Sequence, residues 1–355
     1  MMTILYVDIS NGYKYIKEQP EIAQCLSVYF ITNEKFKDSV LYFYRPVAPQ
    51  VIVGANQNVH FEVDLDYIHS HGIALTRRGA GGGAVYVDSG NLTYSFTVND
   101  DGTNYMNFKH FAQPVIEVLH SIGVDAEMTG RNDLTVNGQK FSGMSTLKIG
   151  DRFTCGGTLM LDVDLKAANE ALNPPKSKLK SKGIKSVKSR VTNLRPYLKG
   201  AYTALTSDQL QEMILKHVFN SSSLDDIPTY VMTNEDWDNV KQIANSKFGD
   251  PDWVMGTTKT FANYHTRHFE GIGTVGINYS VEDGIITHAK VYGDFNNAGG
   301  NLEQIEHSLV GAPYKRDNLI EAFKTGDVQT NIGNVSPEDL ADMLLDDQYK
   351  EELSK

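Results

Sequence analysis

Apolar residues along the chain follow the spacing of helices in some segments and of strands in others. Residues 20–31 begin with proline and stay mostly apolar, which predicts a buried helix. Residues 40–44 and 51–54 are short and rich in β-branched and aromatic side chains, which predicts strands. Residues 65–71 fit a short amphipathic helix that ends at Gly72. The N-terminal part is therefore expected to mix helices and strands.

The pattern changes after the glycines of residues 79–83. Residues 84–87 are a strand candidate, residues 89–91 a turn, and residues 92–98 alternate apolar and polar side chains, as a half-buried antiparallel strand does. A helix over 107–122 precedes a hairpin over 133–144, which turns at Asn137-Gly138. Residues 158–163 supply another strand. A strand and a hairpin therefore follow the glycines.

The C-terminal part has its own pattern. Residues 271–279 and 284–292 predict a second hairpin across Glu282-Asp283-Gly284, and two or three helices follow. One of these helices begins at Ser336-Pro337, a capping hydroxyl followed by proline at the first helical position. We expect a small C-terminal α+β domain from about residue 256.

Composition limits the classes of protein. A chain of 355 residues exceeds the usual size of a single core, which predicts two domains. The net charge of -11 argues against a general nucleic-acid binder. Cys25 and Cys155 are too few for a disulfide framework, which favours the reducing cytoplasm. The N-terminus lacks a signal-peptide pattern, and no run approaches the roughly 18 apolar residues that span a membrane.

A basic segment stands out in this acidic chain. Residues 176–190 follow Pro174-Pro175 and hold seven basic and no acidic residues. We interpret them as a loop that would attract a polyphosphate or an acidic partner.

The glycine-rich segment is the first candidate for chemistry. Backbone N–H groups of Gly81, Gly82 and Gly83 can approach an anion closely, and the forks of Arg77 and Arg78 match phosphate or carboxylate oxygens. The alternative is a flexible turn flanked by solvated arginines. The segment is neither a Walker A loop nor a dinucleotide fingerprint, because no Gly-Lys-Ser/Thr and no helix follow it.

Lys140 is the second candidate. A two-residue turn at Asn137-Gly138 predicts four cross-strand pairs, Val136 with Gln139, Thr135 with Lys140, Leu134 with Phe141 and Asp133 with Ser142. Asp133, Thr135, Lys140 and Ser142 then share one polar face. A lysine held there could neutralise a phosphate or a developing oxyanion. The alternative is a solvated lysine beside a carboxylate.

Several motifs occur together and in order: residues 51–58 (VIVGANQN), residues 77–91 (RRGAGGGAVYVDSGN), residues 132–143 (NDLTVNGQKFSG), residues 157–159 (GTL), residues 182–194 and residues 289–295. Together they resemble the lipoate-protein ligases. The resemblance implies an α+β fold with a mixed, largely antiparallel sheet flanked by helices, as in biotin ligases. It also implies a catalytic domain over 1–250, an adenylate loop at about 176–194 and an accessory domain over 256–355.

The resemblance also implies a two-step reaction. Lipoate or octanoate and ATP form an acyl-adenylate and pyrophosphate, and a lysine of a lipoyl domain then accepts the acyl group. Mapped onto this sequence, the nucleotide contacts are Arg78, Gly83, Ala84, Val85, Tyr86 and Lys140. We expect Lys140 to be catalytic and to contact the lipoyl carbonyl, Arg77, Gly81 and Gly82 to face lipoate, and Asp133 to help hold Mg²⁺ or orient the amine. The expected acceptors are lipoyl domains of 2-oxoacid dehydrogenases or a glycine-cleavage carrier protein.

The sequence departs from the family pattern at four positions. Val87 and Cys155-Gly156 stand where histidines are usual, and Ala55 stands where arginine is usual. Two alternatives therefore stay open: an acyltransferase that uses a Cys155 thioester, and a lipoate-binding or lipoyl-domain-binding protein without catalysis.

Overall fold

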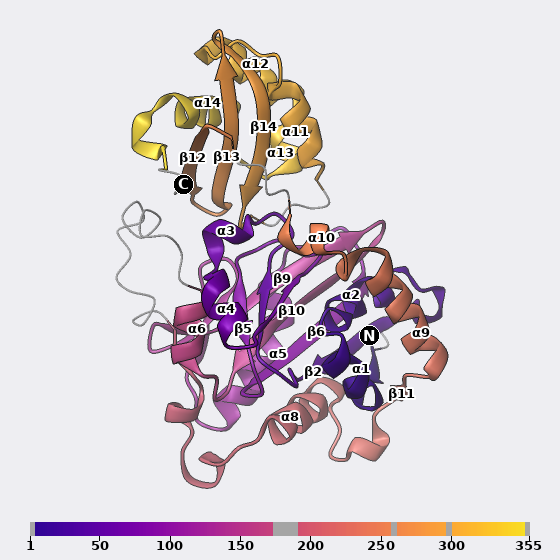
Figure 1. Ribbon diagram of the computed structural model, residues 1–355. Coiled ribbons are helices and arrows are strands. Elements are labelled where there is room, and N and C mark those ends of the chain that lie inside the picture. The colour runs from indigo at the N-terminus through magenta and orange to yellow at the C-terminus, as the bar shows by residue number, and fades with distance from the viewer. Residues whose placement is uncertain (1–3, 173–190, 257–260, 296–299, 352–355) are drawn as a thin grey trace.

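The largest feature of the computed structural model, which describes residues 4–172, 191–256, 261–295 and 300–351, is an eight-stranded sheet (Figure 1). Its strand order is β11-β1-β2-β6-β10-β9-β8-β7. The strands are β1 (Ile4–Asp8), β2 (Ser39–Tyr44), β6 (Asn91–Asn99), β7 (Ala126–Thr129), β8 (Asp133–Val136), β9 (Gln139–Ile149), β10 (Arg152–Met160) and β11 (Thr229–Val231). Strand β1 pairs in parallel with β2 and β11, and the other pairs are antiparallel. The mixed, largely antiparallel sheet is confirmed.

Helices cover both faces of this sheet. Helices α5 (Phe108–Ser121) and α8 (Ser207–Phe219) pack on the face that carries Leu92, Tyr94 and Phe96 of β6. Helices α2 (Ile22–Thr32) and α9 (Asn234–Ile243) lie on the opposite face. Strand β6 is therefore buried on both faces, and the expectation of a half-buried strand was wrong. Its alternating pattern places apolar side chains in the core on one face of the sheet and polar side chains on the face that α2 covers.

A second, three-stranded sheet carries the glycine-rich segment. Its order is β4-β3-β5, with β3 (Gln50–Val53), β4 (Ala74–Arg77) and β5 (Val85–Val87). Strand β5 pairs with β3, so β5 and β6 belong to different sheets and form no hairpin with each other. The turn at residues 89–91 joins the two sheets. Helices α3 (Val59–Glu62), α4 (Leu65–Ser70) and α6 (Leu165–Ala171) pack beside this sheet.

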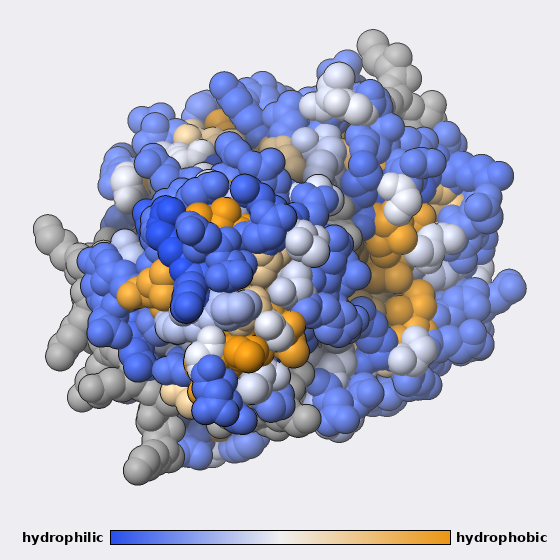
Figure 2. Space-filling view, turned by 90° about the horizontal axis from the view of Figure 1, so that it is seen from above, coloured by the Kyte–Doolittle hydropathy of each residue, from blue (hydrophilic) through white to orange (hydrophobic). Residues whose placement is uncertain are grey.

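The C-terminal residues form a separate small domain, drawn in orange and yellow at the top of Figure 1. Strands β12 (Asn263–Phe269), β13 (Gly273–Glu282) and β14 (Ile285–Gly293) make an antiparallel sheet. Helices α11 (Leu302–Leu309), α12 (Arg316–Thr325), α13 (Val328–Asn331) and α14 (Pro337–Leu345) share a core with it. The predicted small C-terminal α+β domain is confirmed. Figure 2 shows the molecule from above relative to Figure 1. In this view the surface is mainly hydrophilic, with small apolar areas, one of which lies in a hollow.

The two parts of the chain are in direct contact. The Gly293 N–H donates to the Asn56 carbonyl at 2.8 Å, and the rings of Phe61 and Tyr264 stack 4.6 Å apart. The shorter elements are α1 (Tyr13–Glu18), α10 (Pro251–Met255), a π-helix (Ala244–Phe248) and 3-10 turns at Ser10–Gly12, Glu34–Phe36, Arg195–Tyr197, Gly200–Tyr202, Leu224–Asp226 and Asp347–Tyr349.

Within the described ranges no helix has the length and apolar character needed to cross a bilayer.

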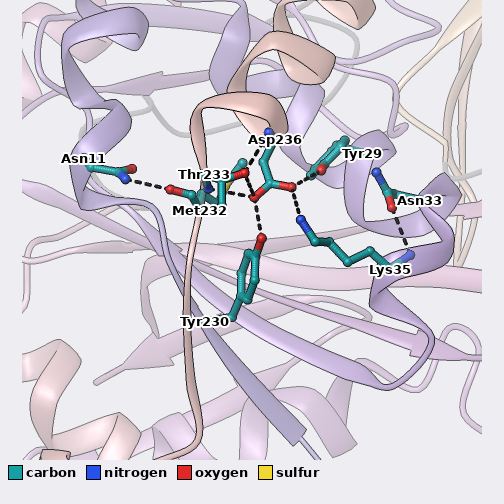
Figure 3. Close-up of polar contacts among 8 residues, drawn as sticks. All are labelled: Asn11, Tyr29, Asn33, Lys35, Tyr230, Met232, Thr233 and Asp236. Atoms are coloured by element: carbon teal, nitrogen blue, oxygen red, sulfur yellow. Dashed lines mark hydrogen bonds and ion pairs between the residues drawn. The ribbon is translucent and has the colours of Figure 1, made fainter.

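A buried carboxylate ties the N-terminal helices to α9 (Figure 3). Asp236 is 1% exposed, and both its oxygens accept hydrogen bonds. Tyr29 and Lys35 donate to Oδ1, each at 2.7 Å. Tyr230 donates to Oδ2 at 2.6 Å, and the backbone N–H and the hydroxyl of Thr233 donate to it at 2.7 and 2.9 Å. Five donors from three segments therefore converge on one side chain.

Candidate active site

A cavity of about 200 Å³ lies on the face of the large sheet that α2 covers. Strand pairing aligns its floor in rows across β2, β6, β10 and β9. One row is Tyr42, Ser95, Gly156 and Ser145, and the next is Tyr44, Thr93, Thr158 and Gly143. Since neighbouring strands lie about 4.8 Å apart, each row spans about 14 Å. Most of these side chains are small, which leaves room above the sheet.

The glycine-rich segment forms one side of the cavity. Its lining residues are Arg78, Gly79, Ala80, Gly82, Gly83, Ala84 and Val85. The Arg78 guanidinium donates to the carbonyl of Gly81 from Nη2 at 2.7 Å and to that of Gly83 at 2.9 Å. Burial, and secondly the charge of Arg77, lower the pKa of Arg78 to about 10. Arg78 therefore shapes the backbone of the segment and stays charged at neutral pH.

Lys140 and Asp133 lie together at the β9 side of the cavity. Lys140 Nζ is 2.7 Å from Asp133 Oδ1, and the Lys140 side chain is 35% exposed. Lys140 and Asn132 line the cavity, whereas Asp133 reaches it through Lys140. Of the four residues predicted on the polar face, only Lys140 lines the cavity, and Thr135 is buried.

The hairpin register was predicted only in part. Pairing of Val136 with Gln139 and of Thr135 with Lys140 is confirmed. Beyond them an irregularity shifts the register, so that Leu134 faces Ser142 and Asp133 faces Gly143. A Cβ at Gly143 would lie 3.0 Å from Lys140 Nζ, whereas Ser142 is buried and does not line the cavity. The prediction that Ser142 shares the face of Lys140 was wrong.

The chain returns to Lys140 directly after the basic segment. Residues 176–190 lie outside the described residues. Val191 forms a parallel bridge with Lys140, and the Thr192 N–H donates to the Lys140 carbonyl at 2.8 Å. The end of the expected adenylate loop is therefore bonded to the backbone of the candidate catalytic lysine.

Three residues expected in the site lie outside the cavity. Arg77 is 2% exposed and donates to backbone carbonyls away from the cavity. Gly81 is buried, and its carbonyl accepts a hydrogen bond from Arg78. The Tyr86 ring packs in the core beside the sheet β4-β3-β5. Strand alternation explains Tyr86, because its neighbour Val85 faces the cavity instead.

Sequence reasoning missed the floor of the cavity. Thr93, Ser95, Thr154, Gly156 and Thr158 line it. None was assigned a role in binding, although Thr158 belongs to a motif of the family and Gly156 is a departure from the family pattern. The signal was the alternation of threonine and serine with large apolar residues in 92–98. The strand expected over 158–163 in fact runs over Arg152–Met160, because Gly156-Gly157 obscures its pattern.

Cys155 points away from this floor. It is 1% exposed, packs in the core against the opposite helices, and does not line the cavity. Burial raises the pKa of its thiol well above the usual value. A buried thiol that stays protonated is a poor nucleophile. The geometry therefore gives no support to a thioester at Cys155.

Comparison with known proteins gives matches along most of the chain. The family profile "Lipoyl protein ligase A/B catalytic domain" matches residues 20–219, and "Bacterial lipoate protein ligase C-terminus" matches residues 258–344. The chain is 34% identical to lipoate-protein ligase LplJ of Bacillus subtilis, over 96% of this chain and 100% of that protein. It is 36% identical to lipoate-protein ligase 1 of Staphylococcus aureus, over 92% and 96%. The chain belongs to the lipoate-protein ligase family. It is therefore a ligase.

Solved structures show the same fold for this ligase. P. falciparum LipL1, solved in complex with lipoate, aligns with a TM-score of 0.70 at 20% identity, over 96% of this chain and 98% of that one. A lipoate-protein ligase A bound with ATP aligns with a TM-score of 0.57 at 21% identity, over 72% and 98%. A bipartite ligase of Thermoplasma acidophilum, described with its E2 lipoyl domain, has a TM-score of 0.58 at 24% identity, over 73% and 97%.

Proposed function

We propose that this ligase activates lipoate with ATP and transfers the acyl group to a lysine of a lipoyl domain. The observation that carries the proposal is the Lys140–Asp133 pair at the β9 side of the cavity that the glycine-rich segment also lines. In the first step a carboxylate oxygen attacks the α-phosphorus and pyrophosphate leaves. The ammonium of Lys140 is positioned to offset the negative charge that gathers there.

The rows of the floor suggest how the acid lies. With its carboxylate at Lys140 on β9, the chain of the acid extends across β10 and β6 toward Tyr42 on β2. Tyr42 and Ser27 of α2 form a hydroxyl pair at that end, 3.1 Å apart. The volume of about 200 Å³ suits the acyl chain rather than a whole acyl-adenylate, since cavities for larger ligands measure about 300–1,000 Å³. The nucleotide would then occupy the side formed by Arg78 and Gly82 to Val85.

Mg²⁺ fits this site only together with the phosphates of ATP. Among the described residues no group of three or more acidic, histidine or cysteine side chains could hold a metal ion. Asp133 offers one carboxylate, which already contacts Lys140. Mg²⁺ is commonly held by one or two carboxylates plus substrate phosphates. Asp133 would be the protein ligand, and the ion would supply further charge neutralisation at the phosphates.

The second step needs an acceptor. A lysine amine of the lipoyl domain attacks the acyl carbonyl, AMP leaves, and the amine loses a proton. The Asp133 carboxylate lies beside Lys140 and could orient the incoming amine. We propose as acceptors the lipoyl domains of 2-oxoacid dehydrogenases and a glycine-cleavage carrier protein.

Pyrophosphate release tests the proposal. Wild-type enzyme with ATP and lipoate should release pyrophosphate, and Lys140→Ala should lower the rate about a hundredfold or more. Lys148→Ala is the matched control, because Lys148 lies on the same strand, pairs with Asp100, and does not line the cavity. A Lys140→Ala enzyme that forms adenylate at the wild-type rate would refute the role of Lys140. Lipoate binding without turnover by wild type, at any acceptor concentration, would instead support a non-catalytic binder.

A further inference from the structure

Arg77 is a buried cation directly beside the cavity that does not face it. Its side chain is 2% exposed, and burial lowers its pKa to about 10, so it stays protonated at neutral pH. A charge buried in this way is costly unless hydrogen bonds compensate it. Backbone carbonyls of two segments that are far apart in the sequence accept from its Nε and Nη1, whereas its buried Nη2 has no hydrogen-bond partner among the described residues.

The first segment is residues 54–57, which follows β3. Arg77 Nη1 donates to the carbonyls of Gly54 at 2.8 Å, Ala55 at 3.2 Å and Gln57 at 2.7 Å. The Gln57 amide oxygen in turn accepts from the Gly54 N–H at 2.9 Å. One guanidinium nitrogen therefore gathers three carbonyls of a tight turn.

The second segment is α10. Arg77 Nε donates to the carbonyls of Trp253 at 2.8 Å and Val254 at 3.1 Å. The Trp253 indole N–H returns a hydrogen bond to the Arg77 carbonyl at 3.2 Å, and the guanidinium lies 6.0 Å from the indole ring centre. Lys247 lies 3.9 Å from the same ring. Arg77 and Trp253 therefore hold each other through both backbone and side chain.

Residues 54–57 support the glycine-rich segment. The Ala55 N–H donates to the Ala80 carbonyl at 2.9 Å. Gly54 approaches Gly82 so closely that a Cβ there would lie 2.0 Å from the Gly82 carbonyl oxygen. Ala80 and Gly82 both line the cavity. A displacement of the 54–57 turn would therefore move the backbone that forms one side of the cavity.

We infer that Arg77 is a positioning residue, which together with Trp253 clamps the 54–57 turn and thereby holds the glycine-rich segment in the shape that binds nucleotide. This role depends on the proposed ATP-dependent activation. The clamp needs a guanidinium group, because the carbonyl acceptors face two of its nitrogens, Nε and Nη1. A lysine offers only a single ammonium group. Because the nucleotide would lie on the side that this segment forms, loss of the clamp should weaken ATP binding more than binding of the acid.

Three variants test the clamp. Arg77→Lys keeps the charge, Arg77→Gln removes it, and Trp253→Phe removes the indole N–H and leaves a smaller aromatic ring. Arg195→Lys is the control, because Arg195 also donates to backbone carbonyls, those of Thr203 and Leu205, and lies outside the cavity lining. The measurements are the KM for ATP, the affinity for lipoate in calorimetry, and amide hydrogen exchange over residues 54–57 and 78–84.

Arg77→Lys should raise the KM for ATP roughly tenfold, as expected for the loss of charge-assisted hydrogen bonds. Arg77→Gln should raise the KM for ATP further and Trp253→Phe less, with faster exchange confined to the two segments and a smaller loss of affinity for lipoate than for ATP. A loss of lipoate affinity in Arg77→Lys as large as the rise in the KM for ATP would overturn the inference in favour of direct contact with the acid. Wild-type kinetics in Arg77→Lys and Trp253→Phe would overturn it as well. Failure of wild type to release pyrophosphate would instead refute the proposed function.

Discussion

Asp236→Asn should strongly destabilise the packing of the N-terminal helices against α9, although it removes no volume. All five groups that contact Asp236 are donors in the structure (Figure 3). An asparagine amide would have to point its own N–H groups at some of these donors. The substitution thus replaces accepted hydrogen bonds with opposed donors in a buried place.

The magnitude follows from burial and from the partners. Removing one member of a buried ion pair costs about 3–5 kcal/mol. Lys35 is 42% exposed and can regain water, whereas Tyr29 is 2% exposed and cannot, so we expect the lower end, about 3 kcal/mol. Asp238→Asn is the control, because Asp238 is 67% exposed beside Lys241 and its loss should cost under about 0.5 kcal/mol.

Urea unfolding followed by tryptophan fluorescence measures this difference. The chain has two tryptophans, and Trp237 is buried next to Asp236. Equal midpoints for Asp236→Asn and Asp238→Asn would refute the reasoning.

The difference in stability between wild type and Asp236→Asn should depend on pH. Burial acts to raise the pKa of Asp236, but hydrogen bonds from Lys35, Tyr230, Tyr29 and Thr233 outweigh it and lower the pKa below the ordinary value. The unfolded state, with a pKa of about 3.9, then binds the proton first as the pH falls. The contribution of Asp236 is therefore complete above about pH 5 and is lost in more acid solution. The stability gap between wild type and Asp236→Asn should narrow below about pH 4, and a constant gap would contradict this explanation.

Three further predictions concern the cavity and its floor. Ser27→Phe should fill the β2 end beside Tyr42 and lower kcat/KM for lipoate and octanoate roughly tenfold or more, with less effect on shorter acids in the pyrophosphate assay; equal losses for all acids would contradict the proposed orientation. Cys155→Ala should keep full activity and lose about 1 kcal/mol in thermal unfolding, and loss of activity in a folded variant would revive the thioester. Gly156→Ala should cost about 1–3 kcal/mol by overpacking, because its Cβ would lie 2.1 Å from the Tyr94 carbonyl oxygen; an unchanged melting temperature would count against that clash.

Local chemistry made the hairpin at Lys140 predictable. Asn137 and Gly138 have φ values of 50° and 73°, the left-handed backbone that such a pair favours in a two-residue turn. The two pairs nearest the turn followed from it. The register shift beyond them did not, because an extra residue in one strand leaves the alternating pattern of the other intact.

The arginines were harder to predict for a different reason. Two adjacent cations before glycines suggested two anion ligands, but Arg77 ends β4 and Arg78 follows it in extended chain, where neighbouring residues face opposite sides. Arg78 therefore reaches the cavity, and Arg77 is directed to carbonyls supplied from residues 54–57 and 253–254. Those acceptors are backbone atoms, which leave no mark in the sequence.

Strand alternation also separates two departures from the family pattern that the sequence presents as neighbours. Cys155 faces the apolar core under α5, and Gly156 lies in the cavity floor between Ser95 and Ser145. A substitution at position 155 acts through packing, whereas one at position 156 changes the surface that the acid would contact. If this ligase differs from its relatives in the acids it accepts, the difference should follow from Gly156 and its row rather than from Cys155.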